Sequence, residues 1–190
     1  FIGLAETLKA LIGKHHGESD EAQELGIKII SHMREATDRY TEQYHLNFSL
    51  IATPAEGLSG RFVKIDAKRY GKIPGVTDRE FYTNSFHTPV YYPIGIFEKI
   101  HREAPYNFLT NGGHITYVEV DGDVAKNEEA FERIIRCMHD EGIGYGSVNH
   151  PLDRDPVCGY SGIIDNVCPC CGRKEEDVAF ERIRRITGYL

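Results

Sequence analysis

Two short turns near the C-terminal end of this 190-residue chain carry residues that can bind a metal ion. Residues 155–159 read Asp-Pro-Val-Cys-Gly and residues 168–172 read Cys-Pro-Cys-Cys-Gly, so both have the form x-Pro-x-Cys-Gly. Each turn sets two potential ligands with two residues between them, and the glycine after the second ligand lets the backbone fold back. The pattern predicts a zinc ribbon in which Zn2+ is held by Cys158, Cys168, Cys171 and Asp155.

The fourth zinc ligand is open among three residues. Asp155 occupies the place of a thiolate, and zinc accepts carboxylate oxygen, whereas His150 and Cys170 are the other nearby donors. Four protein ligands without an open position would make the ion structural, and a carboxylate in place of a thiolate should weaken its binding. The alternative is a set of small buried thiols, or a site that has lost one cysteine. We expect Cys137, outside this cluster, to be a small core residue.

A second candidate site lies where a predicted strand runs into a predicted helix. Residues 46–52 read as a strand that leads through Thr53-Pro54-Ala55-Glu56-Gly57 into a helix reaching about Tyr70. The free N–H groups and the positive dipole of a helix N-terminus favour an anion such as a phosphate. An ordinary helix start, with Thr53 as its cap and Pro54 at its first position, is the alternative. The residues expected to contact a substrate phosphate are Thr53, Ala55, Glu56 and Gly57.

A polar segment before Pro89 is the third candidate. We expect Asn84 and Ser85 to line the substrate site, and the alternative is a turn that satisfies its own backbone groups. The adjacent histidines His15 and His16 are expected at the surface.

Alternating helices and strands must position these residues. The predicted helices cover residues 2–12, 19–44, a segment ending near 70, 93–104 and 127–141, and the predicted strands cover 46–52, 114–120 and 143–148. This order predicts an α/β fold with parallel strand pairing. Composition changes near residue 150, where Cys, Gly and Pro become frequent. We therefore divide the chain into residues 1–149, which form the α/β part with the phosphate loop, residues 150–174, which form the ribbon, and residues 175–190.

Composition and charge exclude some classes of function. Lysine and arginine total 22 against 29 aspartate and glutamate residues, which gives a net charge of −7. This acidity argues against broad nucleic-acid binding and against binding to anionic membranes, and no apolar run approaches the ~20 residues of a membrane span. A cysteine cluster without a secretion signal indicates a reducing cytoplasm. The first residues read like the middle of a longer protein, so we expect the chain to be a piece of one.

Several separated blocks resemble those of one enzyme family. A zinc ribbon followed by Arg185-Ile186-Thr187-Gly188-Tyr189-Leu190 resembles the C-terminal region of anaerobic (class III) ribonucleoside-triphosphate reductases, which are glycyl radical enzymes. The other blocks that look like that family's, in its order, are residues 1–7, Thr53-Pro54-Ala55-Glu56, residues 83–90, Asn111-Gly112-Gly113-His114 and Asn149-His150-Pro151. The resemblance covers the whole chain.

The resemblance implies that Gly188 carries a stored radical, and glycine suits this role because no side chain crowds a planar Cα. It implies a ten-stranded α/β barrel, of which this chain supplies much of the second half, followed by the zinc ribbon and a C-terminal glycyl radical loop. The implied reaction converts ribonucleoside triphosphates to 2′-deoxyribonucleoside triphosphates for DNA replication. The thiyl cysteine would lie in a missing N-terminal part, so the fragment alone should be inactive.

The resemblance also implies partners and alternatives. An iron–sulfur, S-adenosylmethionine-dependent activase would install the radical, and the enzyme would be a homodimer. A formate acetyltransferase-like glycyl radical enzyme is the nearest alternative, but such enzymes usually lack a preceding zinc ribbon. A non-catalytic zinc-ribbon binding module is the alternative from another class, and it would need a basic ribbon face. The acidic residues of the ribbon disfavour it.

Overall fold

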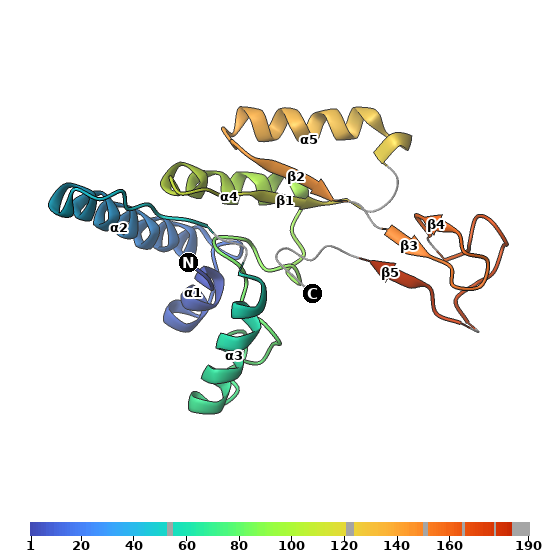
Figure 1. Cartoon of the computed structure of the whole chain (residues 1–190), viewed down its shortest axis with the longest axis horizontal. Coiled ribbons are helices and arrows are strands. Elements are labelled where there is room, and N and C mark those ends of the chain that lie inside the picture. The colour runs from blue at the N-terminus through green and yellow to red at the C-terminus, as the bar shows by residue number, and fades with distance from the viewer. Residues whose placement is uncertain (53–54, 121–123, 150–151, 165, 177, 184–190) are drawn as a thin grey trace.

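The computed structural model describes residues 1–190 except 53–54, 121–123, 150–151, 165, 177 and 184–190 (Figure 1). The elements in chain order are helices α1 (Leu4–Ile12), α2 (Asp20–Tyr44), α3 (Glu56–Tyr70) and α4 (Ile96–Leu109), strand β1 (Thr116–Glu119), the 3-10 turn η1 (Val124–Lys126), helix α5 (Glu128–Asp140), and strands β2 (Gly146–Asn149), β3 (Leu152–Arg154), β4 (Ser161–Gly162) and β5 (Glu181–Ile183). Helices thus dominate the first two thirds of the chain, and short strands dominate its end.

Helices α1, α2 and α4 enclose the first hydrophobic core. The Ser19 hydroxyl caps α2 by accepting the Ala22 N–H over 3.2 Å. The core contains Leu4, Leu8, Ile30, Leu50, Ala52, Phe86 and Tyr106, which come from these helices and from the segments beside them. Leu50 and Ala52 come just before the candidate substrate residues 53–57, and Phe86 follows Asn84 and Ser85. Packing in this shared core therefore brings the two candidate substrate segments together.

Strands β1 and β2 pair in parallel, with Thr116 opposite Gly146 and Glu119 opposite Asn149. Helix α5 connects them, which makes a β–α–β unit and confirms the predicted mixture of helices with parallel strands. A second apolar cluster joins α4, β1 and α5 through Ile100, Val118, Ile134 and Met138. Cys137, which we expected in the core, is partly buried and packs against this cluster.

The prediction of a full strand over residues 46–52 is wrong, because only Ile51 forms a bridge, to Gly113. Side chains bind the backbone groups that a strand ladder would use. The Phe48 N–H donates to the Thr41 hydroxyl over 3.1 Å, and the Leu50 N–H donates to Asn111 Oδ1 over 2.9 Å. The segment still runs parallel to the chain that enters β1.

Helix α4 extends beyond its predicted end. We expected it to stop near residue 104, before Pro105, but Pro105 lies inside the helix, which continues to Leu109. Tyr106 and Asn107 beyond the proline are buried. Their packing outweighs the loss of one helical hydrogen bond at the proline.

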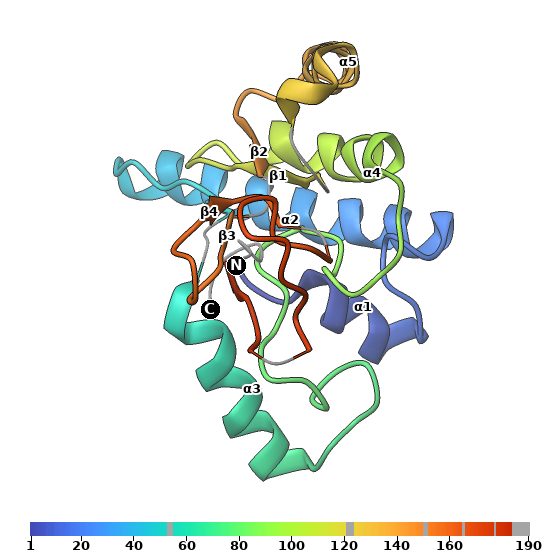
Figure 2. The same ribbon diagram turned by 90° about the vertical axis from the view of Figure 1, so that its right-hand side faces the viewer.

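The C-terminal sheet is a small antiparallel one with the strand order β4-β3-β5. Figure 2 shows this sheet in front of the helices, with α3 extending away from α5. Leu152 is opposite Ile183 in the register of β3 and β5, so β5 ends beside the start of β3. The two sheets among the described residues have two and three strands, and neither closes into a barrel. None of the described helices has the length and apolar character needed to cross a membrane.

Candidate metal centre and substrate loop

The two predicted metal-binding turns have the same backbone structure. The Asp155 N–H donates to the Tyr160 carbonyl over 2.8 Å, and the Cys168 N–H donates to the Arg173 carbonyl over 2.9 Å. In each turn the glycine N–H donates to the carbonyl of the first residue of the turn. Both glycines have positive φ, 77° at Gly159 and 73° at Gly172. Asp155 therefore occupies the same position in its turn as Cys168 occupies in the second.

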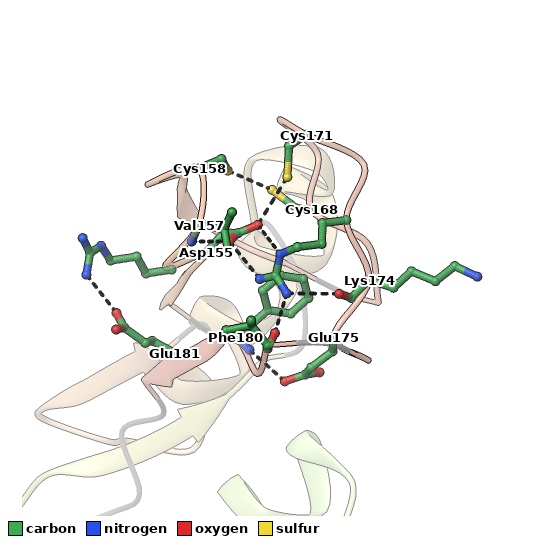
Figure 3. A network of polar contacts seen from close by, with 12 residues as sticks. Asp155, Val157, Cys158, Cys168, Cys171, Lys174, Glu175, Phe180 and Glu181 are labelled. Atoms are coloured by element: carbon green, nitrogen blue, oxygen red, sulfur yellow. Dashed lines mark hydrogen bonds and ion pairs between the residues drawn. The ribbon is translucent and has the colours of Figure 1, made fainter.

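The ligand atoms of Asp155, Cys158, Cys168 and Cys171 all lie within 4.8 Å of one another. Figure 3 shows the three thiols and the carboxylate facing one another. Cys158 Sγ lies 3.6 Å from Cys168 Sγ, and Cys171 Sγ lies 3.4 Å from Asp155 Oδ2. A tetrahedral zinc ion needs about 3.8 Å between two sulfurs and about 3.6 Å between a sulfur and an oxygen. The four residues can therefore hold a metal ion, and the two measured pairs are spaced like ligands that share one ion.

The carboxylate of Asp155 is fully buried and accepts from three N–H donors. Oδ1 accepts the Val157 N–H at 2.8 Å and Arg173 Nη2 at 2.8 Å, while Arg173 Nε lies 3.3 Å from Oδ2. The hydrogen bonds from Arg173 hold the pKa of this carboxyl well below its usual range. Of the alternative ligands, Cys170 is exposed and outside the cluster, and His150 lies outside the described residues.

The C-terminal part of the chain has its own small core and ion pairs beside the candidate ligands. Ile164, Cys168 and Phe180 are buried together. Arg182 of β5 donates to the Ile164 carbonyl over 2.8 Å and lies 3.5 Å from Asp153. Strand β5 is therefore tied to residues next to the two turns, and Phe180 just before it packs against Cys168 of the second turn.

The predicted substrate residues come together in part. Asn84 Oδ1 accepts the Ala55 N–H at 3.0 Å, and both residues are buried. This N–H is thus already used, whereas Gly57 is exposed at the start of α3, where backbone N–H groups have no helical partner. Thr53 lies outside the described residues, and Glu56 is described only as the first residue of α3.

Ser85 stands in a buried loop that α1 holds in place. Its φ of 43° is unusual for a residue with a side chain, and its carbonyl accepts the Leu4 N–H at 3.4 Å. Glu6 of α1 accepts both the N–H and the hydroxyl of Thr83, at 2.9 and 2.6 Å. Burial raises the pKa of Glu6. This loop is therefore structured by long-range contacts as well as by its own turn.

A buried charged network behind this loop was missed by the sequence analysis. Glu103 of α4 accepts the Thr88 N–H at 2.9 Å and lies 3.1 Å from His87 Nδ1 and 2.7 Å from Lys99 Nζ. Burial alone would raise the pKa of Glu103, but the charges of Lys99 and His87 outweigh it and lower the pKa to about 2. The i,i+4 spacing of Lys99 and Glu103 was the available signal.

The prediction that His15 and His16 lie at the surface is wrong, because they are 2% and 0% exposed. The two rings pack against each other with their centroids 6.0 Å apart, and the His16 ring also packs against Tyr106. His16 Nε2 lies 2.7 Å from the Phe86 carbonyl. Burial lowers the pKa of His16 to about 4, so the ring is neutral at pH 7.

A cavity of about 600 Å³ lies between α1 and α3. Its lining includes Phe1, Glu6, Leu11, Phe62, Asp66 and Tyr82. None of Ala55, Gly57, Asn84 and Ser85 lines it, so this largely apolar cavity and the predicted phosphate loop are separate features.

A sequence model of anaerobic ribonucleoside-triphosphate reductases matches residues 1–190. The chain belongs to this family. The anaerobic ribonucleoside-triphosphate reductase of Escherichia coli K12 is 36% identical over 196 residues, which cover 100% of this chain and 27% of the relative. The enzyme of the same name from Enterobacteria phage T4 is 38% identical over 197 residues, which cover 100% of this chain and 30% of the relative. The chain thus spans less than a third of the length of these reductases.

Solved structures of anaerobic reductases share the fold. The anaerobic ribonucleotide reductase from Thermotoga maritima with dATP bound in its specificity site gives a TM-score of 0.70 at 18% identity, and the match covers 91% of this chain and 28% of that chain. Another anaerobic ribonucleotide reductase gives a TM-score of 0.69 at 20% identity, covering 90% of this chain and 25% of the other.

Proposed function

We propose that this chain is a C-terminal portion of a catalytic subunit that reduces ribonucleoside triphosphates to 2′-deoxyribonucleoside triphosphates by glycyl and thiyl radical chemistry. The proposal is supported by a candidate metal site and a Gly-Tyr motif that occur together in one chain of this family. A cluster of three thiols and a carboxylate with zinc-like spacing precedes Gly188-Tyr189 in a chain that matches the reductase family over its whole length. The thiyl cysteine would belong to a part of the enzyme outside these residues.

Gly188 stores the radical in this proposal. The residue lies outside the described residues, and the support comes from the strand before it. Strand β5 is fixed to β3 and ends at Ile183, beside the strand that follows the α/β part. Pairing with β3 therefore fixes the strand that comes directly before residues 184–190 in the sequence. Without a side chain, the Cα of Gly188 can become planar and share an unpaired electron with its neighbouring amide groups.

Zn2+ is the proposed resident ion of the ribbon, held by Asp155, Cys158, Cys168 and Cys171. Zinc supplies no redox chemistry and, with four protein ligands, would act by fixing the two turns relative to each other. The residues around it then hold β5, through Arg182 and through the packing of Phe180 on Cys168.

The substrate triphosphate would bind at the start of α3. Because the Ala55 N–H is bonded to Asn84, the backbone N–H groups left for a phosphate are those of Glu56 and Gly57, with Thr53 as the third contact. Asn84 then supports the turn through the Ala55 N–H, and Asn84 and Ser85 would line the substrate site beside it. We further propose that the complete enzyme forms a ten-stranded barrel, is a homodimer and is located in the cytoplasm. An iron–sulfur, S-adenosylmethionine-dependent activase would install its radical.

Electron paramagnetic resonance of the complete enzyme tests the proposal. The enzyme is activated without oxygen and examined for a doublet from a radical on a glycine Cα. We expect the doublet and the formation of deoxynucleotide in the wild type, and the loss of both after Gly188→Ala. Gly95→Ala is the control for the substitution itself, because Gly95 is exposed, has a φ of −68° and would place its Cβ within 4 Å of no other atom. An unchanged doublet in the Gly188→Ala enzyme would overturn the assignment.

A further inference from the structure

The two oxygens of Asp155 have different neighbours, and Arg173 accounts for the difference. Arg173 Nη2 binds Oδ1 at 2.8 Å, together with the Val157 N–H, whereas Arg173 Nε lies at a looser 3.3 Å from Oδ2. Oδ2 is also the oxygen 3.4 Å from Cys171 Sγ. Oδ2 therefore faces the thiols, and Oδ1 faces away from them.

A carboxylate ligand creates a requirement that a thiolate does not. A thiolate offers one donor atom, but a carboxylate offers two oxygens, and the second oxygen of the fully buried Asp155 must be satisfied elsewhere. If no donor held Oδ1, the carboxylate could rotate toward the ion and bind through both oxygens. The planar fork of an arginine is suited to prevent that rotation.

The charge of the candidate metal site also favours a cation beside Asp155. Three thiolates and one carboxylate carry −4, so the site with Zn2+ has a formal charge of −2. The guanidinium of Arg173 adds +1 and leaves −1. In a buried setting this compensation is larger than it would be in water.

The guanidinium is itself held in place by groups other than Asp155. Nη1 donates to the carbonyls of Lys174 and Val178, and the guanidinium carbon lies 4.5 Å from the centroid of the Phe180 ring. Figure 3 shows Lys174 and Phe180 beside the ligand cluster. These contacts fix the guanidinium independently of Asp155.

We propose that Arg173 is a positioning residue that makes Asp155 a metal ligand through Oδ2 alone, and that the site needs this arginine because its first turn carries a carboxylate. This inference rests on the proposed metal site. It predicts that Asp155 and Arg173 act as a pair, so that the cost of losing Arg173 depends on which residue stands at position 155.

Zinc retention in the full-length enzyme tests the pair. The variants are Arg173→Gln, Arg173→Lys, Asp155→Cys and the double variant Asp155→Cys/Arg173→Gln, each purified without oxygen and titrated with a zinc chelator. We expect Arg173→Gln alone to weaken zinc binding by about 10- to 100-fold, as for other groups that orient metal ligands. Arg173→Lys should recover only part of this, because lysine lacks the fork. In the Asp155→Cys background, Arg173→Gln should change zinc binding by no more than about twofold.

The absorption spectrum of the Co2+-loaded enzyme gives a second readout that does not depend on activity. Arg173→Gln should alter the cobalt bands of the enzyme with Asp155, because the carboxylate can then rotate, and should leave them unchanged in the Asp155→Cys background. Arg154→Gln is the matched control, since Arg154 pairs with Glu181 at the surface.

The outcomes separate the inference from the metal site itself. Equal loss of zinc on Arg173→Gln in both backgrounds would show a general structural role for Arg173 and overturn the inference alone. Unaltered zinc binding and cobalt bands in Arg173→Gln would overturn it as well. Absence of zinc from freshly purified wild-type enzyme, together with failure to bind Co2+, would overturn the metal site and the inference with it.

Discussion

Asn84 Oδ1 accepts the Ala55 N–H at 3.0 Å and thereby joins two buried segments that lie 29 residues apart. We expect Asn84→Ala to leave this buried N–H unpaired and to lower the free energy of unfolding by about 1–3 kcal/mol. Urea unfolding measures the change. Asn47→Ala, at an exposed position, is the control and should change stability by less than about 0.5 kcal/mol. Equal stability of both variants would contradict this role of Asn84.

Glu103 should set part of the acid stability of the protein. Its pKa is lowered to about 2 in the folded chain, against about 4.3 for an unperturbed glutamate, so its contribution is complete above about pH 4.3 and disappears as the pH falls through 2. Glu103→Ala leaves Lys99 and His87 without their shared carboxylate. We expect a loss of about 3–5 kcal/mol at pH 7, measured by urea unfolding. The difference between wild type and variant should shrink at lower pH, and a constant difference down to pH 2 would argue against this.

His16 should make the protein less stable as the pH falls through the range below neutrality. Its folded pKa of about 4 lies below the ordinary value of about 6.5, so the unfolded chain takes up a proton first. The stabilising effect of neutral His16 is complete above about pH 6.5 and is lost as the pH falls through 4. The total loss of unfolding free energy is roughly 3 kcal/mol. His16→Gln should flatten the decline of unfolding free energy between these pH values. The same slope in wild type and variant would exclude this source.

Two helical glycines should respond in opposite directions to alanine. A Cβ at Gly26 in α2 would overlap the Tyr106 hydroxyl and lie 3.2 Å from Leu8 Cδ1, whereas a Cβ at Gly57 in α3 would meet nothing within 4 Å. Gly26→Ala should therefore destabilise the protein by about 1–3 kcal/mol despite the better helix propensity of alanine. Gly57→Ala should stabilise it by up to about 1 kcal/mol. Thermal unfolding of both variants distinguishes these signs, and stabilisation by both would contradict the packing around Gly26.

Removal of the metal ion should loosen the ribbon selectively. After chelation without oxygen, we expect the N–H groups of Asp155 and Cys168, which close the two turns, to exchange with deuterium at least about tenfold faster, because zinc sites contribute directly to folding. The N–H groups of Val118 and Val148 in β1 and β2 serve as the internal control and should be unaffected. Exchange that is unchanged in the ribbon would show that the turns hold without an ion.

Local spacing predicted the ribbon turns and most helices. The two turns depend on residues that are neighbours in sequence, so the pattern of proline, cysteine and glycine was sufficient to define them. Helices α1, α2 and α5 lie close to their predicted bounds because their apolar residues recur with the helical period. The zinc-like spacing of the four ligand atoms could not be predicted from local sequence, because the two turns are separated along the chain and only the fold brings them together.

The sequence did not predict the burial of residues whose partners lie far away along the chain. Glu103 is charged and stands in an amphipathic helix, where a solvent-facing position is normal, yet it is buried against His87 and the Thr88 N–H. His16 gave no signal for burial, because its partner, the Phe86 carbonyl, lies 70 residues away. Residues 46–52 had the composition of a strand, but the Thr41 and Asn111 side chains take its backbone donors. In each case tertiary contacts outweigh local preference.

The shared hydrogen-bond frame of the two turns has a consequence for ion selectivity. The same pair of main-chain hydrogen bonds closes each hairpin, so its first position can hold oxygen or sulfur without a change of backbone, as Asp155 and Cys168 show. An oxygen corner makes the ligand set harder, and hard ligands bind soft ions such as Cu(I) less well than sulfur does. The ribbon of this chain should therefore discriminate against copper more strongly than an all-sulfur ribbon of the same shape.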